Sequence, residues 1–352
     1  MAKIGPLRAF WGIGAPGSGK HQLESVWPVH GSVLVRDGVL YCVAGRSMFL
    51  DGGMRFLRLD ARTGEKLSET VLDERHPQTG EHLQADLKWP NLPTGLPDVL
   101  SSDGRYVYMR AQRFDLMGKR PEVVAPTEYT DQTGEGAHLF CPTGFLDDAG
   151  WHRTYWLFGK SFIGGAGGWH LACLRAPAGR IMVFDESSIY GFGRTPERLR
   201  GSPFAYHLFA TEKQPEFAPI DPRAKPEGRG RFGGIIRTKP EYRWSEPVPL
   251  LARAMALAGE TLFIAGPPDV LDEADAYQRI SDADIQAKLA GQAAAFQGRK
   301  GGLLWAVSAS DGRKLAEYAL DAPPAWDGMA AARGRLYIAT LDGRVLCMGR
   351  GT

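Results

Sequence analysis

The sequence predicts an all-β fold, a β-propeller built from four-stranded antiparallel blades. Two repeated units predict this fold: a β-hairpin that occurs twice, and a pair of strands around a glycine turn that occurs four times. The composition agrees, because 44 Gly, 24 Pro, nine Trp and eleven Tyr among 352 residues are typical of many short strands joined by tight turns. At roughly 45 residues a blade, we expect about 5 to 8 blades, whole or partial.

The repeated hairpin is FLRLDARTGEKLSETVL at 56–72 and LWAVSASDGRKLAEYAL at 304–320. In both copies apolar and other residues alternate, the chain turns at Thr-Gly or Asp-Gly, and the alternation resumes. The identical positions are Ala61, Gly64, Lys66, Leu67, Glu69 and Leu72, which recur as Ala309, Gly312, Lys314, Leu315, Glu317 and Leu320. Each copy therefore predicts two adjacent strands of a blade.

The second unit is a short strand, a turn at glycine, and a strand rich in aromatic or branched residues. It is written VLVRDGVLYCV (33–43), VLSSDGRYVYM (99–109), MALAGETLFIA (255–265) and MAAARGRLYIA (329–339). Together with the hairpin it completes one four-stranded antiparallel sheet, and such sheets repeated around an axis form a propeller.

The remaining chain is less regular. The segments 138–162 and 179–194 still predict strands, with turns at Asp-Asp and Asp-Glu-Ser. The segments rich in proline and charge are predicted to be loop insertions that cover one face: 73–96, 116–137 and 212–247. One helical insertion is predicted near 281–297, because Ser281 and Asp284 form an S-x-x-D start and alanine and leucine follow at helical spacing.

Charge and hydropathy exclude several classes of protein. The 42 basic and 40 acidic residues leave a net charge of +2 and are spread along the chain, so we expect no nucleic-acid partner. No apolar run approaches the ~20 residues of a transmembrane helix, so no transmembrane segment is predicted. The first residues lack the apolar stretch of a signal peptide.

The four cysteines are far apart and form no C-x-x-C pair, which argues against a zinc knuckle or a redox motif. Cys42, Cys173 and Cys347 lie in apolar strand-like runs and are predicted to be buried free thiols, and Cys141 is the fourth. No metal site is predicted.

Residues 12–21, GIGAPGSGKH, match the phosphate-binding pattern G-x-x-x-x-G-K, but His21 occupies the place of the Ser or Thr that would hold magnesium. Only about seven residues separate Lys20 from Pro28, too few for the helix that this motif requires. The stretch is predicted to be a flexible glycine turn.

The blade motifs RDGVLYCV, RLDARTGEKL, SASDGRKL and LDGRVLCMG resemble the pyrroloquinoline-quinone (PQQ) type repeat of quinoprotein dehydrogenases and of an outer-membrane assembly lipoprotein. The phrases FLDDAGWHRTYWLFG and PAGRIMVFDESSIYGFGR resemble the C-terminal part of larger bacterial PQQ-like propeller repeat proteins. This resemblance implies a propeller domain over 22–352 and a periplasmic or cell-envelope location. Residues 1–21 match nothing in the pattern and are predicted to be a flexible N-terminal segment.

The resemblance leaves function open, because the same propeller serves catalysts and scaffolds. The resembling dehydrogenases hold PQQ with calcium and commonly cover one face with a disulfide between adjacent cysteines, and no two cysteines are adjacent here. We therefore expect a non-catalytic binding or scaffold propeller with a protein or glycan partner and no cofactor. A PQQ-dependent dehydrogenase of alcohols or sugars, with calcium, and a carbohydrate-active propeller are the alternatives.

The densest set of polar and aromatic residues predicts a ligand-binding platform made of Asp147, Asp148, Trp151, His152, Arg153, Tyr155, Trp156, Trp169 and His170. The tryptophans would stack on a planar or sugar-like ligand, and His152 or Arg153 would hold an anionic group. In the structural alternative the two aspartates form a turn while Tyr155 and Trp156 pack between blades.

A glycoside hydrolase would need two carboxylates facing each other across a cleft. The candidates are Asp147, Asp185 and Glu186, but nothing in the sequence pairs them. The alternative for Asp185 and Glu186 is the tip of a hairpin within MVFDESSIYGF.

Overall fold

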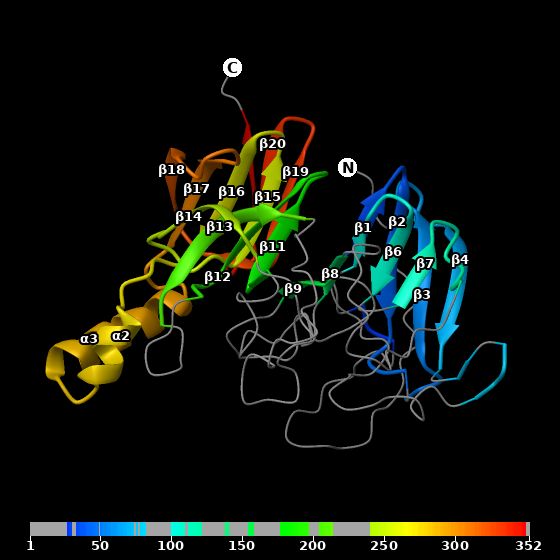
Figure 1. The fold of residues 1–352 in the computed structure, drawn as a ribbon, viewed down its shortest axis with the longest axis horizontal. Helices are drawn as coiled ribbons and strands as arrows, with labels where there is room; N and C mark the ends of the chain where they lie inside the picture. Colours follow the sequence, from blue (N-terminus) through cyan, green and yellow to red (C-terminus); the bar gives the residue numbers. More distant parts are fainter. Residues whose placement is uncertain are drawn as a thin grey trace, which may run out of the picture. The chain divides into compact units, whose positions relative to one another are not determined.

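The computed structural model describes residues 27–29, 33–48, 50–73, 75–76, 78–81, 100–109, 112–121, 138–140, 154–157, 177–196, 204–213 and 240–349. These residues form six antiparallel sheets and two helices (Figure 1). The chain divides into two compact units, the first holding β1 to β8 and the second holding β10 to β21 with both helices. Residues 1–21 lie outside the described part, and a single domain over 22–352 stays a prediction.

The first unit begins with a four-stranded sheet in chain order: β1 (Leu34–Arg36), β2 (Val39–Ala44), β3 (Met54–Asp60) and β4 (Lys66–Leu72). A three-stranded sheet follows: β5 (Ser101–Ser102), β6 (Tyr106–Met109) and β7 (Gln112–Asp115). The two sheets share one hydrophobic core, in which the rings of Phe56 and Phe114 stack with centroids 4.1 Å apart. β8 (His138–Phe140) also lies in this unit, whereas β10 (Ala178–Gly179) pairs within the second unit with Thr154 and Tyr155 of β9 (Thr154–Leu157).

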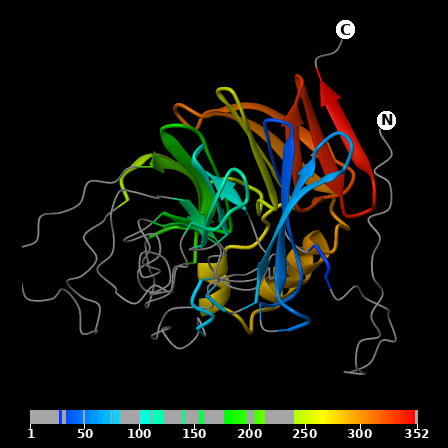
Figure 2. The same ribbon diagram turned by 90° about the vertical axis from the view of Figure 1, so that its right-hand side faces the viewer.

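The second unit contains three successive sheets. The first is β11 (Ile181–Phe184), β12 (Ser188–Arg194), β13 (Tyr206–Glu212) and β14 (Tyr242–Glu246), and the second is β15 (Ala254–Ala258), β16 (Thr261–Gly266), β17 (Gly302–Ser308) and β18 (Lys314–Leu320). The third is β19 (Pro324–Ala332), β20 (Arg335–Thr340) and β21 (Val345–Gly349). The first strands of the three sheets, β11, β15 and β19, are neighbours in that order (Figure 2). Successive blades of a propeller meet through such strands, so the predicted all-β propeller is confirmed.

The repeated hairpin is confirmed in detail as β3–β4 and β17–β18. Both copies shift register at the same point, between Arg58 and Leu59 and between Ala306 and Val307. Both turn at a glycine with positive φ, +74° at Gly64 and +77° at Gly312. Both also place a lysine Nζ 2.8 Å from the glutamate three residues later.

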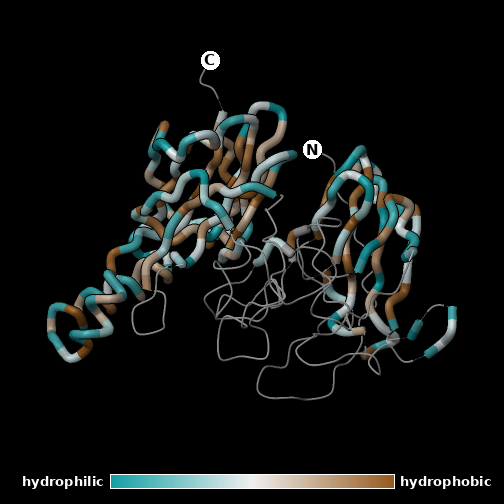
Figure 3. Tube along the Cα trace, in the orientation of Figure 1, coloured by the Kyte–Doolittle hydropathy of each residue, from teal (hydrophilic) through white to brown (hydrophobic). Residues whose placement is uncertain are grey.

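The glycine-turn unit is also confirmed. Asp37 and Gly38 between β1 and β2 have φ of +49° and +78°, and Arg333 and Gly334 between β19 and β20 have φ of +52° and +72°. Two successive positive φ angles make the turn whose twist suits a tight hairpin. Figure 3 shows hydrophobic residues along the strands and hydrophilic ones at many of these turns.

Two helices, α2 (Glu273–Gln278) and α3 (Ala283–Phe296), lie between β16 and β17. α3 confirms the helix predicted near 281–297, although Asp282 rather than Ser281 is its N-cap. α2 was not predicted, because six residues are too few to display helical periodicity. Neither of the described helices has the length and apolar character needed to cross a membrane.

The prediction of buried thiols holds for Cys42, whose burial raises its pKa to about 11. It is wrong for Cys347, which is exposed. Cys347 lies on β21, the last strand of its sheet, where Leu346 and Met348 are half-buried while Val345, Cys347 and Gly349 are exposed. Cys141 and Cys173 lie outside the described residues.

Candidate functional site

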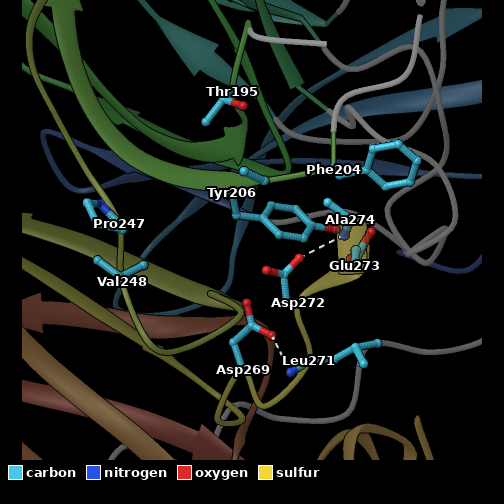
Figure 4. A pocket seen from close by; sticks show the side chains of 11 residues that line it. Thr195, Phe204, Tyr206, Pro247, Val248, Asp269, Leu271, Asp272, Glu273 and Ala274 are labelled. Carbon is cyan, nitrogen blue, oxygen red and sulfur yellow. Dashed lines mark hydrogen bonds between the residues drawn. The ribbon is translucent and has the colours of Figure 1, made fainter. Parts of the chain in front are cut away.

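A pocket of about 510 Å³ lies between one end of the sheet β11–β14 and the start of α2 (Figure 4). The sheet contributes Tyr206 at the start of β13, together with Thr195 after β12 and Val248 after β14. Three carboxylates also line it: Asp269 and Asp272 from the segment before α2, and Glu273, the first residue of α2. We call this the acidic pocket.

Arg194 attaches α2 to the sheet. Its side chain is buried, its Nη1 donates to the carbonyl oxygen of Phe204 at 2.8 Å, and its guanidinium lies 2.8 Å from the Glu273 carboxylate. The same guanidinium lies 3.7 Å from the centroid of the Tyr206 ring, at cation–π distance. A buried arginine with these partners holds the wall of the acidic pocket in one position.

The carboxylates of the pocket differ in their roles. Asp272 is the N-cap of α2 and accepts hydrogen bonds from the amides of Ala274 and Asp275 at 2.9 and 3.0 Å. Asp269 accepts a long bond of 3.4 Å from the amide of Leu271. Burial raises the pKa of Asp269, the hydrogen bond from the Leu271 amide lowers it in part, the charge of Glu273 raises it and the charge of Arg194 lowers it. A cation beside Asp269 would stabilise the charged form of its carboxylate.

A second pocket of about 430 Å³ opens between α2 and α3. Most of its lining is apolar, and it includes Leu251 from the segment before β15 and Leu289 from α3. Three large side chains on its walls are well exposed: Tyr277 at 54%, Ile280 at 51% and Phe296 at 40%. The Tyr277 and Phe204 rings lie with centroids 5.1 Å apart. We call this second pocket the apolar groove.

The platform predicted from sequence is described only at Tyr155 and Trp156. Both lie on β9 and are buried, with 5% and 1% of their surfaces exposed. The other members lie outside the described residues, namely Asp147, Asp148, Trp151, His152, Arg153, Trp169 and His170. The platform as a ligand site therefore stays a prediction.

Asp185 lies at the hairpin tip between β11 and β12. Its Oδ1 accepts the amides of Ser187 and Ser188, each at 2.8 Å, and its Oδ2 accepts the Tyr190 hydroxyl at 3.1 Å. Burial alone would raise the pKa of Asp185, but these hydrogen bonds outweigh it and lower the pKa. Its carboxylate closes a turn. Glu186 is exposed beside it, and Asp147 lies outside the described residues.

The implied quinone and calcium can be tested against the donor groups. Among the described residues, no three His, Cys, Asp or Glu side chains gather closely enough to hold a metal ion. The expectation of no cofactor, and the alternative of PQQ with calcium, both stay predictions.

Sequence reasoning missed the acidic pocket and the apolar groove. Their walls come from three stretches far apart in the chain, 194–206, 247–251 and 269–296. The one local signal is the run DVLDEADAYQRISDAD at 269–284, in which acidic and apolar residues are interleaved.

No family model matches the chain, and no curated protein matches it. Similar solved structures include BamB from Moraxella catarrhalis, 11% identical with a TM-score of 0.34 over 90% of this chain and 70% of that one. They also include the quinohemoprotein alcohol dehydrogenase ADHIIG from Pseudomonas putida HK5, 14% identical with a TM-score of 0.29 over 93% of this chain and 41% of that one. The corresponding Comamonas testosteroni enzyme is 12% identical, with a TM-score of 0.27 over 93% of this chain. This chain spans 42% of the Comamonas enzyme's length, so it covers less than half of either dehydrogenase.

The fold type is decided by the chain's own motifs and their places in the sheets. RDGVLYCV forms the β1–β2 hairpin and RLDARTGEKL forms the turn of β3–β4, so the two motifs together build one blade. The chain is a β-propeller. In this propeller the repeat makes blades, and the helices and both pockets lie in or beside the helical insertion that interrupts the repeat.

Proposed function

We propose that this propeller binds another protein through the apolar groove and that its blades act as a scaffold. The exposure of Tyr277, Ile280 and Phe296 around one groove supports the proposal. Large apolar side chains gathered in this way gain free energy when a partner removes them from water. A protein partner suits the groove better than a glycan, because most of the lining is aliphatic or aromatic and carries few hydrogen-bonding groups.

A stable support for the groove favours binding. The Arg194–Glu273 ion pair fixes α2 to the sheet β11–β14. Gln292 of α3 accepts the amide of Val270 at 2.8 Å and donates to the carbonyl oxygen of Pro268 at 3.1 Å. A preformed groove loses little conformational entropy on binding. The resemblance to PQQ-like propeller proteins leads us to propose the bacterial cell envelope as the place of action.

Photo-crosslinking tests the proposal. A photoreactive amino acid replaces Ile280 in the groove or, as the matched control, Leu315 on β18, since the two residues are 51% and 46% exposed. We expect position 280 to yield a discrete adduct with one envelope protein and position 315 to yield none. Equal labelling at both positions, or none at position 280, would overturn the proposal. Stoichiometric retention of PQQ with calcium and dye reduction on alcohols would overturn the scaffold role.

A further inference from the structure

The apolar groove and the acidic pocket are parts of one continuous surface. Four residues line both of them: Phe204, Asp269, Leu271 and Glu273. A ligand that fills the apolar groove can therefore place a neighbouring chemical group next to the carboxylates of the acidic pocket. The charge at this junction of the two pockets determines which kind of group is favoured.

The junction is acidic. Residues 269–284 contain six carboxylates and one basic residue, Arg279. Arg279 is already engaged, because its guanidinium lies 2.8 Å from Asp282, 2.9 Å from Asp284 and 3.2 Å from Asp275. Of the six carboxylates, Asp269, Asp272 and Glu273 line the pockets, so with the Arg194 guanidinium counted the formal excess there is two negative charges. The later basic residues Lys288, Arg299 and Lys300 line neither pocket.

Asp269 is the carboxylate that best accepts a new partner. It is half-buried, it lines both pockets, and it accepts a long hydrogen bond of 3.4 Å from the amide of Leu271. The raised pKa of Asp269 has burial as its main cause; the hydrogen bond from the Leu271 amide opposes it, and the charge of Glu273 adds to it. An ammonium or guanidinium group would add a positive charge and a charge-assisted hydrogen bond.

We propose that the joined site, which rests on the binding function proposed above, recognises a protein segment that carries a lysine or arginine next to a large apolar residue. The apolar side chain lies in the groove between α2 and α3, and the basic side chain enters the acidic pocket toward Asp269. An acidic segment is repelled by the carboxylates, and a segment lacking the apolar residue leaves the groove exposed. Attraction between opposite charges also directs the encounter.

Fluorescence anisotropy with three synthetic peptides tests this inference. One peptide carries lysine and leucine side by side, the second has glutamate for lysine, and the third has serine for leucine. We expect the first to bind at least about ten-fold more tightly than either of the others. We also expect its affinity to fall as salt rises from about 50 to about 500 mM, because salt screens the charge interaction.

Single substitutions locate the effect. Asp269→Asn should weaken binding of the lysine peptide about ten-fold and reduce the ratio of its affinity to that of the glutamate peptide. Ile280→Ser should weaken binding of every peptide. The matched controls are Asp311→Asn in the β17–β18 turn and Leu315→Ser on β18, which should leave all affinities unchanged. Melting curves establish that each variant is folded.

The outcomes separate this inference from the proposed function. A glutamate peptide that binds as tightly as the lysine peptide, no effect of Asp269→Asn, or no binding by any peptide would overturn the inference. If position 280 still forms its adduct with an envelope protein in those cases, the binding function stands alone. An adduct between two copies of this chain would overturn the inference. The absence of any adduct at position 280 would overturn both the inference and the proposed binding function.

Discussion

The blades β1–β4 and β15–β18 contain the same hairpin but differ in the connection between their second and third strands. In the first blade, residues 45–53 make this connection, and in the second, residues 267–301 make it and include α2 and α3. Each connection ends at an equivalent glycine, Gly53 in the first blade and Gly301 in the second. A Cβ at Gly53 would lie 2.3 Å from the carbonyl oxygen of Leu72, and one at Gly301 would lie 2.6 Å from that of Leu320.

The comparison shows which part of the pattern is needed for the blade. The strands, the turn and the glycine that enters the third strand are equivalent in the two copies, so the helical insertion leaves the blade unchanged. The exposed apolar groove is found on the insertion, and the repeat itself packs blades together. Stability and binding should therefore respond to substitutions in different regions.

The largest expected difference in stability is between two phenylalanines. Phe56 in β3 is 1% exposed and Phe296 in α3 is 40% exposed. Phe56→Ala should lower the free energy of unfolding by about 3–5 kcal/mol, because a buried aromatic ring is removed from the core. Phe296→Ala should change it by about 1 kcal/mol or less and weaken partner binding instead. Chemical denaturation and anisotropy measure the two effects, and equal losses of stability would contradict the division of roles.

The next effect concerns pH and the sheet that supports the insertion. His207 on β13 is buried, and its Nδ1 lies 2.7 Å from the Ser245 hydroxyl. Burial lowers the pKa of His207 from 6.5 to about 4, so between these pH values the unfolded chain binds more protons. Its contribution to stability is complete above pH 6.5 and falls by about 3 kcal/mol as the pH drops toward 4.

Denaturation at pH 7.5, 5.5 and 4.5 measures this dependence. His207→Gln should remove the part of the slope that lies between pH 6.5 and 4 while leaving the loss below that range, which reflects aspartates with lowered pKa values. An unchanged slope in the variant would show that His207 is protonated in the folded protein.

A smaller effect separates the two copies of the hairpin turn. Gly64 and Gly312 both have positive φ, so alanine should cost about 1–2 kcal/mol at either position. At Gly64 the added Cβ meets nothing within 4 Å, whereas at Gly312 it would lie 2.7 Å from the Trp244 ring. Gly312→Ala should therefore cost about 1–3 kcal/mol more than Gly64→Ala. Equal melting temperatures of the Gly64→Ala and Gly312→Ala variants would contradict the packing of Trp244 on the turn at Gly312.

The smallest effect is at the equivalent surface ion pairs. Lys66–Glu69 and Lys314–Glu317 have the same 2.8 Å separation, but Glu69 also bonds Arg55 and is less exposed than Glu317, at 24% against 44%. Glu317→Gln should cost about 0.2–0.5 kcal/mol and Glu69→Gln up to about 1 kcal/mol. High salt should reduce both costs, and denaturation with and without salt measures them.

The blades were predictable because their signals are local. Period-two alternation and glycine at the turn can be read from one short stretch, as at Gly64 and Gly312. The candidate site was not, because Arg194, Tyr206, Asp269 and Ile280 come together only when the sheet and the insertion have folded. Local density of aromatic residues also does not report exposure.

Residues 151–156 show this last point. Their aromatic density predicts a ligand platform, and the two described aromatic residues there, Tyr155 and Trp156, are buried on β9. Cys347 shows the reverse case, since an apolar run predicted burial and the last strand of a sheet exposes it. The sequence pattern identifies a strand, but the position of that strand in its sheet decides what is covered.

Backbone hydrogen exchange tests most directly whether the insertion is the binding region and the repeat is the scaffold. It is measured with and without the lysine–leucine peptide or the crosslinked partner. We predict that binding slows exchange in 269–296 and 204–209 and leaves both hairpins, 54–72 and 302–320, unchanged. If exchange slows only in 147–156 or only in the two hairpins, and not in 269–296, the division into a binding insertion and a scaffold repeat is contradicted.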